Sequence, residues 1–237
     1  MLTSKGFDTV ISILGNRGMK LQPAIIDVAI SAGVREFYPS EYGSDIAQGA
    51  YLTNRYFRDK HLTRTHLAKV ISSNRNFNYT LVMVGGFMEF ATKDLFGINT
   101  KEHKFTFYGQ PEKEEPLTAT ADVAKIIVAS TLLPKSPTQI REFRAPTGLY
   151  PWSEIIATIS AAQGVEYKCT FHSVEQAEAL QATFAAKGDV EQELAFSLKA
   201  IMGDLKQTGV PKPWDNGMFD WERQSLETAM KHLFSTE

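Results

Sequence analysis

The sequence of 237 residues has a single cysteine and no apolar run of the roughly 20 residues that a membrane-spanning helix requires. One cysteine excludes an internal disulfide and is typical of a protein from a reducing compartment. The formal net charge of −2 provides no electrostatic footprint for nucleic acid or an anionic membrane. The first residues also lack the apolar segment of a signal peptide. These absences predict a soluble, cytoplasmic protein that binds neither nucleic acid nor membranes.

Several motifs of catalytic sites are missing as well. The nucleotide-binding pattern Gly-x-Gly-x-x-Gly does not occur, and residues 15–18 are too short to replace it, so we predict a loop there. A Gly-x-Ser-x-Gly elbow for a nucleophilic serine is absent. None of the five histidines has a partner at metal-ligand spacing, so the sequence predicts no metal site.

The first half of the chain does contain a regular alternation of strand and helix patterns. A β-branched run at residues 8–15, stopped by glycine, predicts a strand. Residues 23–33 predict a helix, with proline in its first turn and glycine just past its end, and residues 34–38 predict the next strand. A helix at 54–74 and a strand at 79–84 form a second such unit. The short connections make these β-α-β units, whose strands lie parallel in one sheet.

The pattern changes near Thr147. Before this residue we predict strands at 104–108 and 142–145, a charged loop at 109–116, a helix at 120–133, and a loop or short helix at 87–100. After it we predict helices at 151–163, 173–187, 189–207 and 220–234, a strand at 167–171 and a loop at 209–217. The chain therefore has an α/β first part and a smaller, mostly helical second part, which we expect to form one wall of a cleft.

The polar loop after the second strand is the first candidate site, because ligands of parallel α/β sheets bind beyond the carboxyl ends of the strands. Pro39 ends this strand, and Ser40, Glu41 and Tyr42 follow. In one interpretation the Ser40 hydroxyl or the Tyr42 ring lines a ligand site. In the other, Ser40 caps a turn, and Glu41 and Asp45 are solvated loop charges.

Lys60 is the second candidate, because of its place on the helix at 54–74. One face of this helix carries Phe57, Lys60, Arg64, Leu67 and Ile71, at spacings of three and four residues. In one interpretation the Lys60 stem covers apolar surface and its amine reaches water. In the other, the amine points into a cleft, where it holds a cofactor ribose or acts as an acid or base with a pKa lowered by burial.

The glycine pair Gly85 and Gly86 is the third candidate, since it ends the strand at 79–84. Glycines at a strand end let a ligand approach the backbone closely. The alternative is a tight turn that places Phe87 in the core.

A set of short stretches is spread over the first 147 residues. They are Val-Ile-Ser-Ile-Leu-Gly at 10–15, Gln22, Ala-Gly-Val-Arg-Glu-Phe-Tyr-Pro-Ser-Glu-Tyr-Gly at 32–43, Phe-Arg-Asp-Lys at 57–60, Tyr-Thr-Leu-Val at 79–82, Gly-Gly-Phe at 85–87 and Thr-Ala-Asp-Val-Ala at 120–124. Together they resemble the NmrA-like or isoflavone reductase-like group of the atypical short-chain dehydrogenases. The most specific feature is Pro-Ser-Glu-Tyr-Gly with a lysine in the following helix. Gly86 replaces an asparagine usual in the group.

The resemblance implies an incomplete doubly wound, Rossmann-like parallel sheet of the NAD(P)-binding type in residues 1–147, and a helical substrate part in residues 148–237. It implies Lys60 as the catalytic residue and NADP(H) or NAD(H) as the cofactor. The cofactor contacts that it implies are Ser12, Leu14, Gly15, Gln22, Pro39, Ser40, Lys60, Gly85, Gly86 and Phe87. The substrate contacts that it implies are Tyr42, Met88 and Phe90.

The sequence departs from the group at its start. Members of the group begin with a strand, a Gly-x-x-Gly-x-x-Gly loop, a helix and a second strand, whereas residues 8–15 correspond to about the fourth strand. We therefore expect the pyrophosphate and adenosine subsites to be absent and the nicotinamide half and the substrate cleft to be present. Affinity for a dinucleotide should fall, because backbone N–H groups and the helix dipole of the missing segment supply its main anion site.

Three functions are compatible with these residues. The first is an NAD(P)H-dependent oxidoreductase that reduces a small aromatic or secondary-metabolite substrate. The second is a cofactor-free isomerase, dehydratase or cyclase, with Lys60, Tyr42 and Glu41 as acid–base groups. The third is a non-catalytic regulator of the NmrA type, in which exposed apolar surface binds a protein partner or a second copy of the chain. We rank the reductase first.

Overall fold

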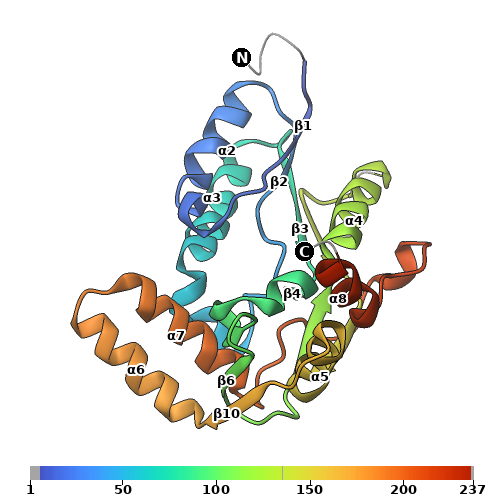
Figure 1. Ribbon diagram of the computed structural model, residues 1–237. Coiled ribbons are helices and arrows are strands. Elements are labelled where there is room, and N and C mark those ends of the chain that lie inside the picture. The colour runs from blue at the N-terminus through green and yellow to red at the C-terminus, as the bar shows by residue number, and fades with distance from the viewer. Residues whose placement is uncertain (1–5, 135, 236–237) are drawn as a thin grey trace.

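The centre of the computed structural model, which describes residues 6–134 and 136–235, is a four-stranded parallel sheet of order β1-β2-β3-β8. Its strands are β1 (Thr9–Ile11), β2 (Glu36–Tyr38), β3 (Asn78–Met83) and β8 (Ile140–Arg144). The helices that cover it are α2 (Gln22–Ser31) and α3 (Arg58–Ser73) on one side and α4 (Thr120–Leu132) on the other (Figure 1). The prediction of an α/β fold built on parallel strands is confirmed.

Two small sheets lie beyond the carboxyl ends of these strands. One has the order β10-β6-β5 and consists of β5 (Ile98–Asn99), β6 (Lys104–Tyr108) and β10 (Lys168–His172). The other has the order β4-β7-β9 and consists of β4 (Gly86–Phe87), β7 (Glu114–Thr118) and β9 (Gly148–Pro151). Strand β9 runs antiparallel to β7, and β10 runs parallel to β6. Both sheets therefore combine segments from before and after Thr147.

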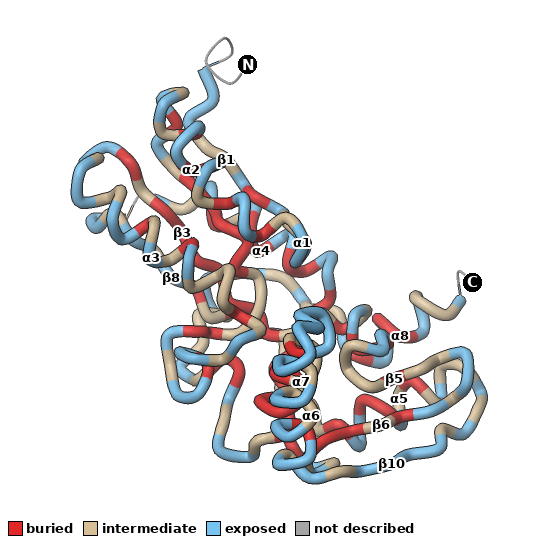
Figure 2. The backbone as a smooth tube through the Cα atoms, turned by 90° about the vertical axis from the view of Figure 1, so that its left-hand side faces the viewer, coloured by how far each residue is buried: buried red, intermediate tan, exposed pale blue. Residues whose placement is uncertain are grey.

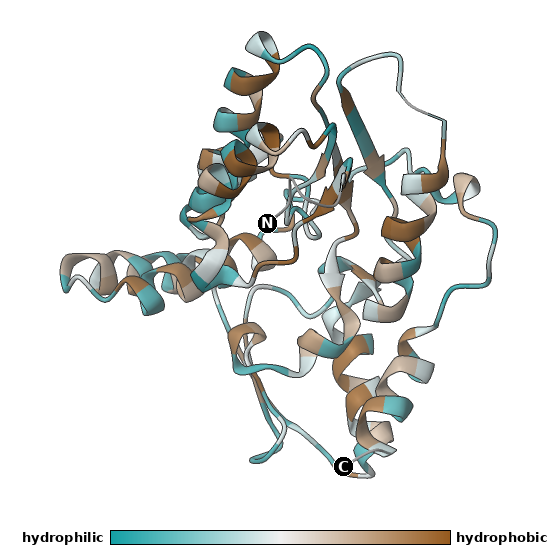
Figure 3. Ribbon diagram, turned by 90° about the horizontal axis from the view of Figure 1, so that it is seen from above, coloured by the Kyte–Doolittle hydropathy of each residue, from teal (hydrophilic) through white to brown (hydrophobic). Residues whose placement is uncertain are grey.

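The remaining helices surround the small sheets. They are α1 (Asn16–Met19), α5 (Trp152–Gln163), α6 (Val174–Ala186), α7 (Val190–Gly203) and α8 (Leu226–Ser235). Five 3₁₀ turns complete the described elements: Gly49–Leu52, Arg55–Phe57, Met88–Thr92, Asp94–Phe96 and Asn216–Met218. The α6–α7 hairpin projects from the body of the molecule (Figures 1 and 3). No helix within the described ranges is long and apolar enough to cross a membrane.

The central strand β3 is buried on both faces (Figure 2). Successive side chains of a strand point to opposite sides, so Leu81 and Met83 face α2 and α3 while Val82 packs with Ile126 of α4. A strand covered on both faces gives a continuous apolar run in the sequence. This explains why the predicted strand at 79–84 agrees with β3 to within one residue at each end.

The structure corrects two predictions near the amino terminus. The strand predicted at 8–15 is only Thr9–Ile11, because its neighbour β2 is equally short and the last bond between them joins the Ser12 N–H to the Tyr38 carbonyl. The loop predicted at 15–18 was wrong, because Asn16–Met19 form the single turn of α1.

Two further corrections concern the second half. The loop predicted at 109–116 was wrong in its last part, where Glu114 begins β7. This strand forms because β4 and β9 supply hydrogen-bonding partners from distant parts of the sequence, which no local pattern reports. The terminal helix predicted at 220–234 begins only at Leu226. Residues 220–225 instead continue a loop in which the Gln224 N–H donates to the buried Asp122 carboxylate.

Candidate active site

A cavity of about 680 Å³ lies where the carboxyl ends of the parallel strands meet the β4-β7-β9 sheet. The side of the cavity formed by strand ends, α1 and α3 is lined by Ile13, Leu14, Gly15, Asn16, Arg17, Gly18, Met19, Ser40, Tyr42, Gly43, Ser44, Tyr56, Phe57, Lys60, Gly85 and Gly86. The other lining residues are Phe87, Phe90, Ala91, Leu95, Phe96, Glu115, Leu117, Trp152, Leu198 and Met202. The cavity is therefore where sheet topology predicts a ligand site.

The structure brings most of the predicted site residues together at this cavity. Those in its lining are Leu14, Gly15, Ser40, Tyr42, Lys60, Gly85, Gly86, Phe87 and Phe90. Those outside the lining are Ser12, Gln22, Pro39 and Met88. Met88 is fully buried in the core cluster below the aromatic side.

Ser12, Gln22 and Ser40 form a buried polar network directly behind the strand ends. The Ser40 hydroxyl donates to the Ser12 carbonyl at 2.8 Å and accepts from the Leu14 N–H at 2.7 Å. The Gln22 carbonyl oxygen accepts from the Ser12 hydroxyl at 2.8 Å and from the Ser40 N–H at 2.9 Å. Ser12 and Gln22 thus support the lining, and Ser40 is part of both the network and the lining.

Helix α3 carries Lys60 to the cavity, as the cleft interpretation predicts. Its Nζ would lie only 3.1 Å from a Cβ placed on Gly43, so glycine at this position gives the amine room against the loop after β2. Within the described chain, the Lys60 amine makes no hydrogen bond or ion pair. Burial lowers the pKa of Lys60, the Glu41 charge opposes this shift, and the Arg64 charge adds to it. Lys60 is therefore an amine that is available to a ligand.

The carboxylates of the loop after β2 are buried, so the interpretation of them as solvated charges was wrong. Glu41 has no exposed surface, and its Oε2 accepts from Arg64 Nη2 at 2.9 Å and from Nε at 3.1 Å. Asp45 accepts from Arg144 at 2.7 and 3.0 Å through its Oδ2. Glu41 Oε1 has no hydrogen-bond partner. Both bonds from Arg64 go to the same oxygen of Glu41, and this carboxylate makes no bond to Lys60 in the described structure.

Tyr42 lines the cavity but packs mainly away from Lys60. Its ring contacts the cluster between the sheet and α4, which includes Tyr38 and Val82. Its hydroxyl is buried without a hydrogen-bond partner, and burial raises its pKa, followed by the nearby Tyr38 and Glu41. A phenol that holds its proton in this way is a wall residue of the cavity rather than a ready base.

The β7 wall of the cavity includes residues that were not predicted from the sequence, among them Glu115 and Leu117. Glu115 lines the cavity and is paired with Lys113, whose Nζ donates to Glu115 Oε1 at 3.1 Å and to the Glu114 carbonyl at 2.7 Å. Burial raises the pKa of Glu115 and the Lys113 charge lowers it. Lys113, Glu115 and Leu117 recur at every second residue, which is the strand period. This signal was available, but two of the three positions are charged and suggest a loop.

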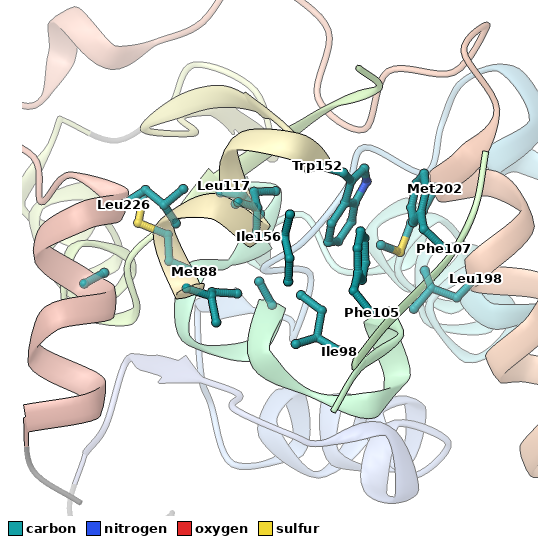
Figure 4. Packing of buried hydrophobic residues seen from close by; sticks show 14 of the residues in the cluster. Met88, Ile98, Phe105, Phe107, Leu117, Trp152, Ile156, Leu198, Met202 and Leu226 are labelled. Atoms are coloured by element: carbon teal, nitrogen blue, oxygen red, sulfur yellow. The ribbon is translucent and has the colours of Figure 1, made fainter. Parts of the chain in front are cut away.

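Aromatic rings make up much of the same wall. Phe87 and Phe90 meet edge to face at 5.3 Å between ring centroids, and Trp152 lies 6.4 Å from Phe96. Trp152 packs against Phe105 and Phe107, with ring centroids 5.8 and 5.0 Å away (Figure 4). Its indole N–H has no hydrogen-bond partner. This half of the cavity suits an apolar, planar ligand, whereas the half formed by strand ends offers an amine and glycine backbone.

Solved structures of similar fold cover nearly the whole chain. The complex of leucoanthocyanidin reductase with NADPH from Vitis vinifera has a TM-score of 0.74 at 15% identity, over 99% of this chain and 80% of that one. An isoflavone reductase has a TM-score of 0.66 at 20% identity, over 98% and 77% of the two chains. The triphenylmethane reductase of a Citrobacter species has a TM-score of 0.63 at 14% identity, over 98% and 79%. The fold is thus the Rossmann-like fold of these reductases.

The sequence comparisons agree with this fold. The oxidoreductase aprR of Aspergillus flavus is 25% identical over 187 residues, which is 78% of this chain and 62% of that protein. The chain therefore spans about three fifths of the length of this relative. The model of the NmrA-like family matches residues 3–224. This chain belongs to the NmrA-like family.

Proposed function

We propose that this protein is an NAD(P)H-dependent reductase of a small aromatic substrate and that Lys60 is its catalytic residue. The observation that carries the proposal is the Lys60 amine, which lies at the cavity beside Gly43 and has no hydrogen-bond or ion-pair partner among the described residues. The oxidoreductase relative and the NADPH complex of similar fold support the choice of reaction.

The half of the cavity formed by strand ends fits the nicotinamide end of such a cofactor. Gly15, Gly43 and Gly86 expose backbone along this wall, so a flat ring and its ribose can approach closely. Lys60 would donate hydrogen bonds to ribose hydroxyls, and the Ser40 network would keep the strand ends in place. When bound, the cofactor supplies a hydride.

Lys60 is also suited to handle the proton that accompanies reduction. Its pKa is lowered by burial, so the amine gives up a proton more readily than an exposed lysine. Glu41 limits this effect, and Arg64 holds Glu41 away from direct pairing with the amine. The protonated Lys60 would donate to a developing oxyanion of the substrate, with the aromatic wall excluding water.

The test is titration of the protein with NADPH, followed by turnover with a panel of aromatic ketones and enones. We expect NADPH to bind and at least one compound to be reduced with loss of NADPH absorbance. The substitution Lys60→Met should lower kcat/KM by about 10²–10⁴-fold, the usual contribution of a positioned acid or base.

Lys69→Met is the matched control, because Lys69 lies exposed on the same helix. It should leave turnover unchanged. Absence of both NADPH binding and NADPH oxidation would refute the proposal. Conversion of a substrate without nucleotide, lost in Lys60→Met, would instead identify the cofactor-free enzyme.

A further inference from the structure

Three buried residues with polar side chains lie at the end of the β7–β9 ladder. Glu115 lies opposite Tyr150 in the register of the two strands, and the backbone N–H of Trp152 donates to the Lys113 carbonyl at 3.2 Å. Lys113, Glu115 and Trp152 are 4%, 8% and 1% exposed. Glu115 and Trp152 both line the cavity. A buried ion pair in an otherwise apolar wall is costly to desolvate, so its retention calls for an explanation.

The hydrogen bonds of this group are incomplete. Lys113 donates to Glu115 Oε1, and within the described chain no donor reaches the second carboxylate oxygen. The Trp152 indole N–H also lacks an acceptor, and Figure 4 shows this nitrogen at the end of the ring farther from Ile98. The second Glu115 oxygen therefore remains as an acceptor for a ligand, whereas the indole N–H is enclosed by the protein.

Glu115 and Lys60 come from different elements, since Lys60 is on α3 and Glu115 is on β7, where Lys113 is bonded to it. Phe96, Leu117 and Trp152 line the same cavity as Glu115. The cavity therefore has a second polar site, set in its apolar half.

We propose that Glu115, held by Lys113, is the specificity-determining residue of the cavity and binds a hydroxyl group on an aromatic ligand. A hydroxyl donates to the carboxylate oxygen in a short charge-assisted bond. A ligand carboxylate would face the negative charge of Glu115 and bind less well. The identification of this ligand with a substrate rests on the proposed function, but its binding requires no cofactor.

The test uses three naphthalene probes in equilibrium dialysis without nucleotide. We expect 2-naphthol to bind about tenfold more tightly than 2-methoxynaphthalene, as a hydrogen bond to a charged group allows, and 2-naphthoate to bind most weakly. The paired substitution Lys113→Met with Glu115→Leu removes both charges together, so neither is left buried alone. In this variant the preference for 2-naphthol should fall to within about twofold, because no carboxylate remains to accept its proton.

Glu114→Gln is the matched control, because Glu114 is the exposed neighbour on the same strand, and it should keep the full preference. If thermal unfolding shows that the paired variant does not fold, Glu115→Gln replaces it, with an expected loss of at least about threefold in preference. Equal binding of 2-naphthol and 2-methoxynaphthalene, an unchanged preference in the variants, or tightest binding of 2-naphthoate would overturn the proposal. A preference for 2-naphthol without NADPH binding would support the role of Glu115 and refute the proposed reductase. NADPH binding and turnover without that preference would support the reductase and refute the role of Glu115.

Discussion

Two lysine–glutamate combinations lie at the cavity, Lys60 with Glu41 and Lys113 with Glu115, and their hydrogen bonds differ. Of these four residues, Lys60 and Glu115 line the cavity. At the strand ends, Glu41 is bonded by Arg64, so the Lys60 amine has no bonded partner in the described structure. At the β7 wall, Lys113 is bonded to Glu115 and to a backbone carbonyl, so the amine is fixed and one carboxylate oxygen remains. The first combination therefore offers a ligand the Lys60 amine, and the second offers it one carboxylate oxygen of Glu115.

The difference shows that a third residue, here Arg64, decides whether the lysine or the glutamate is left without a bond. Arg64 bonds the carboxylate of Glu41 through two nitrogens and leaves the more flexible amine to a ligand. Lys113 has no such competitor, and it bonds its glutamate two residues along the same strand. The amine suits proton transfer, and the carboxylate suits recognition of a donor.

Removal of Arg64 should break this arrangement most severely. Arg64→Met leaves the fully buried Glu41 without its bonded cation, which we expect to cost about 3–5 kcal/mol in the free energy of unfolding. Urea denaturation measures this change. The double substitution Arg64→Met with Glu41→Gln should recover most of the loss, because no buried charge is left alone. A loss below about 1 kcal/mol in the single variant would mean that Glu41 does not depend on Arg64.

Removal of Lys113 should have a smaller, pH-dependent effect. Lys113→Met leaves Glu115 buried without a cation, at a cost of about 3 kcal/mol at neutral to alkaline pH. Burial already raises the pKa of Glu115, and loss of the lysine raises it further. The folded state therefore takes up a proton at a higher pH than the unfolded chain does, so the cost is full above the folded pKa and shrinks as the pH falls through it. Urea midpoints at about pH 8 and pH 5 test this, and a cost independent of pH would contradict it.

The smallest expected effect is a gain in stability. Lys60→Met removes a buried amine without a bonded partner and should stabilise the fold by about 0.5–2 kcal/mol, as is common when a functional residue is replaced. Since burial lowers the pKa of Lys60, the gain is full below the folded pKa and fades as the pH rises toward the ordinary lysine value of about 10.4. Thermal melts over this range, with Lys69→Met as control, measure it. A destabilised Lys60→Met variant would assign the lysine a structural role.

Part of the site could be predicted because it lies where strands end. The apolar runs that end at Tyr38 and Val84 indicated β2 and β3, and parallel strands bring their carboxyl ends to one edge. Ser40, Gly85 and Gly86 therefore reached the cavity by topology alone. Helical spacing placed Lys60 on a largely apolar face but left open whether its amine reaches water or a cleft, and the resemblance to the family favoured the cleft.

The β7 part of the cavity was not predicted, because the strand period at Lys113, Glu115 and Leu117 falls in a charged segment and the strands that pair with it are distant in the sequence. Gly85, at a φ of 74°, would bring a Cβ to 2.0 Å from the Pro116 carbonyl, so glycine is required where β7 passes the end of β3. Nothing local in the charged segment around Lys113 reports this contact. Glu41 was misjudged for the same reason, since its cation comes from a helix 23 residues further along the chain.

The sequence by itself determined the parallel sheet, its covering helices and the edge at which the cavity lies, because hydrophobic periodicity and short connections are local properties. Only the tertiary structure decided which partner each buried charged group is bonded to, because this depends on which side chains the fold brings within hydrogen-bond distance. Lys60 and Lys113 look alike in the sequence. Arg64 bonds Glu41, so the Lys60 amine is available to a ligand, whereas the Lys113 amine is bonded to Glu115 two residues further along the chain.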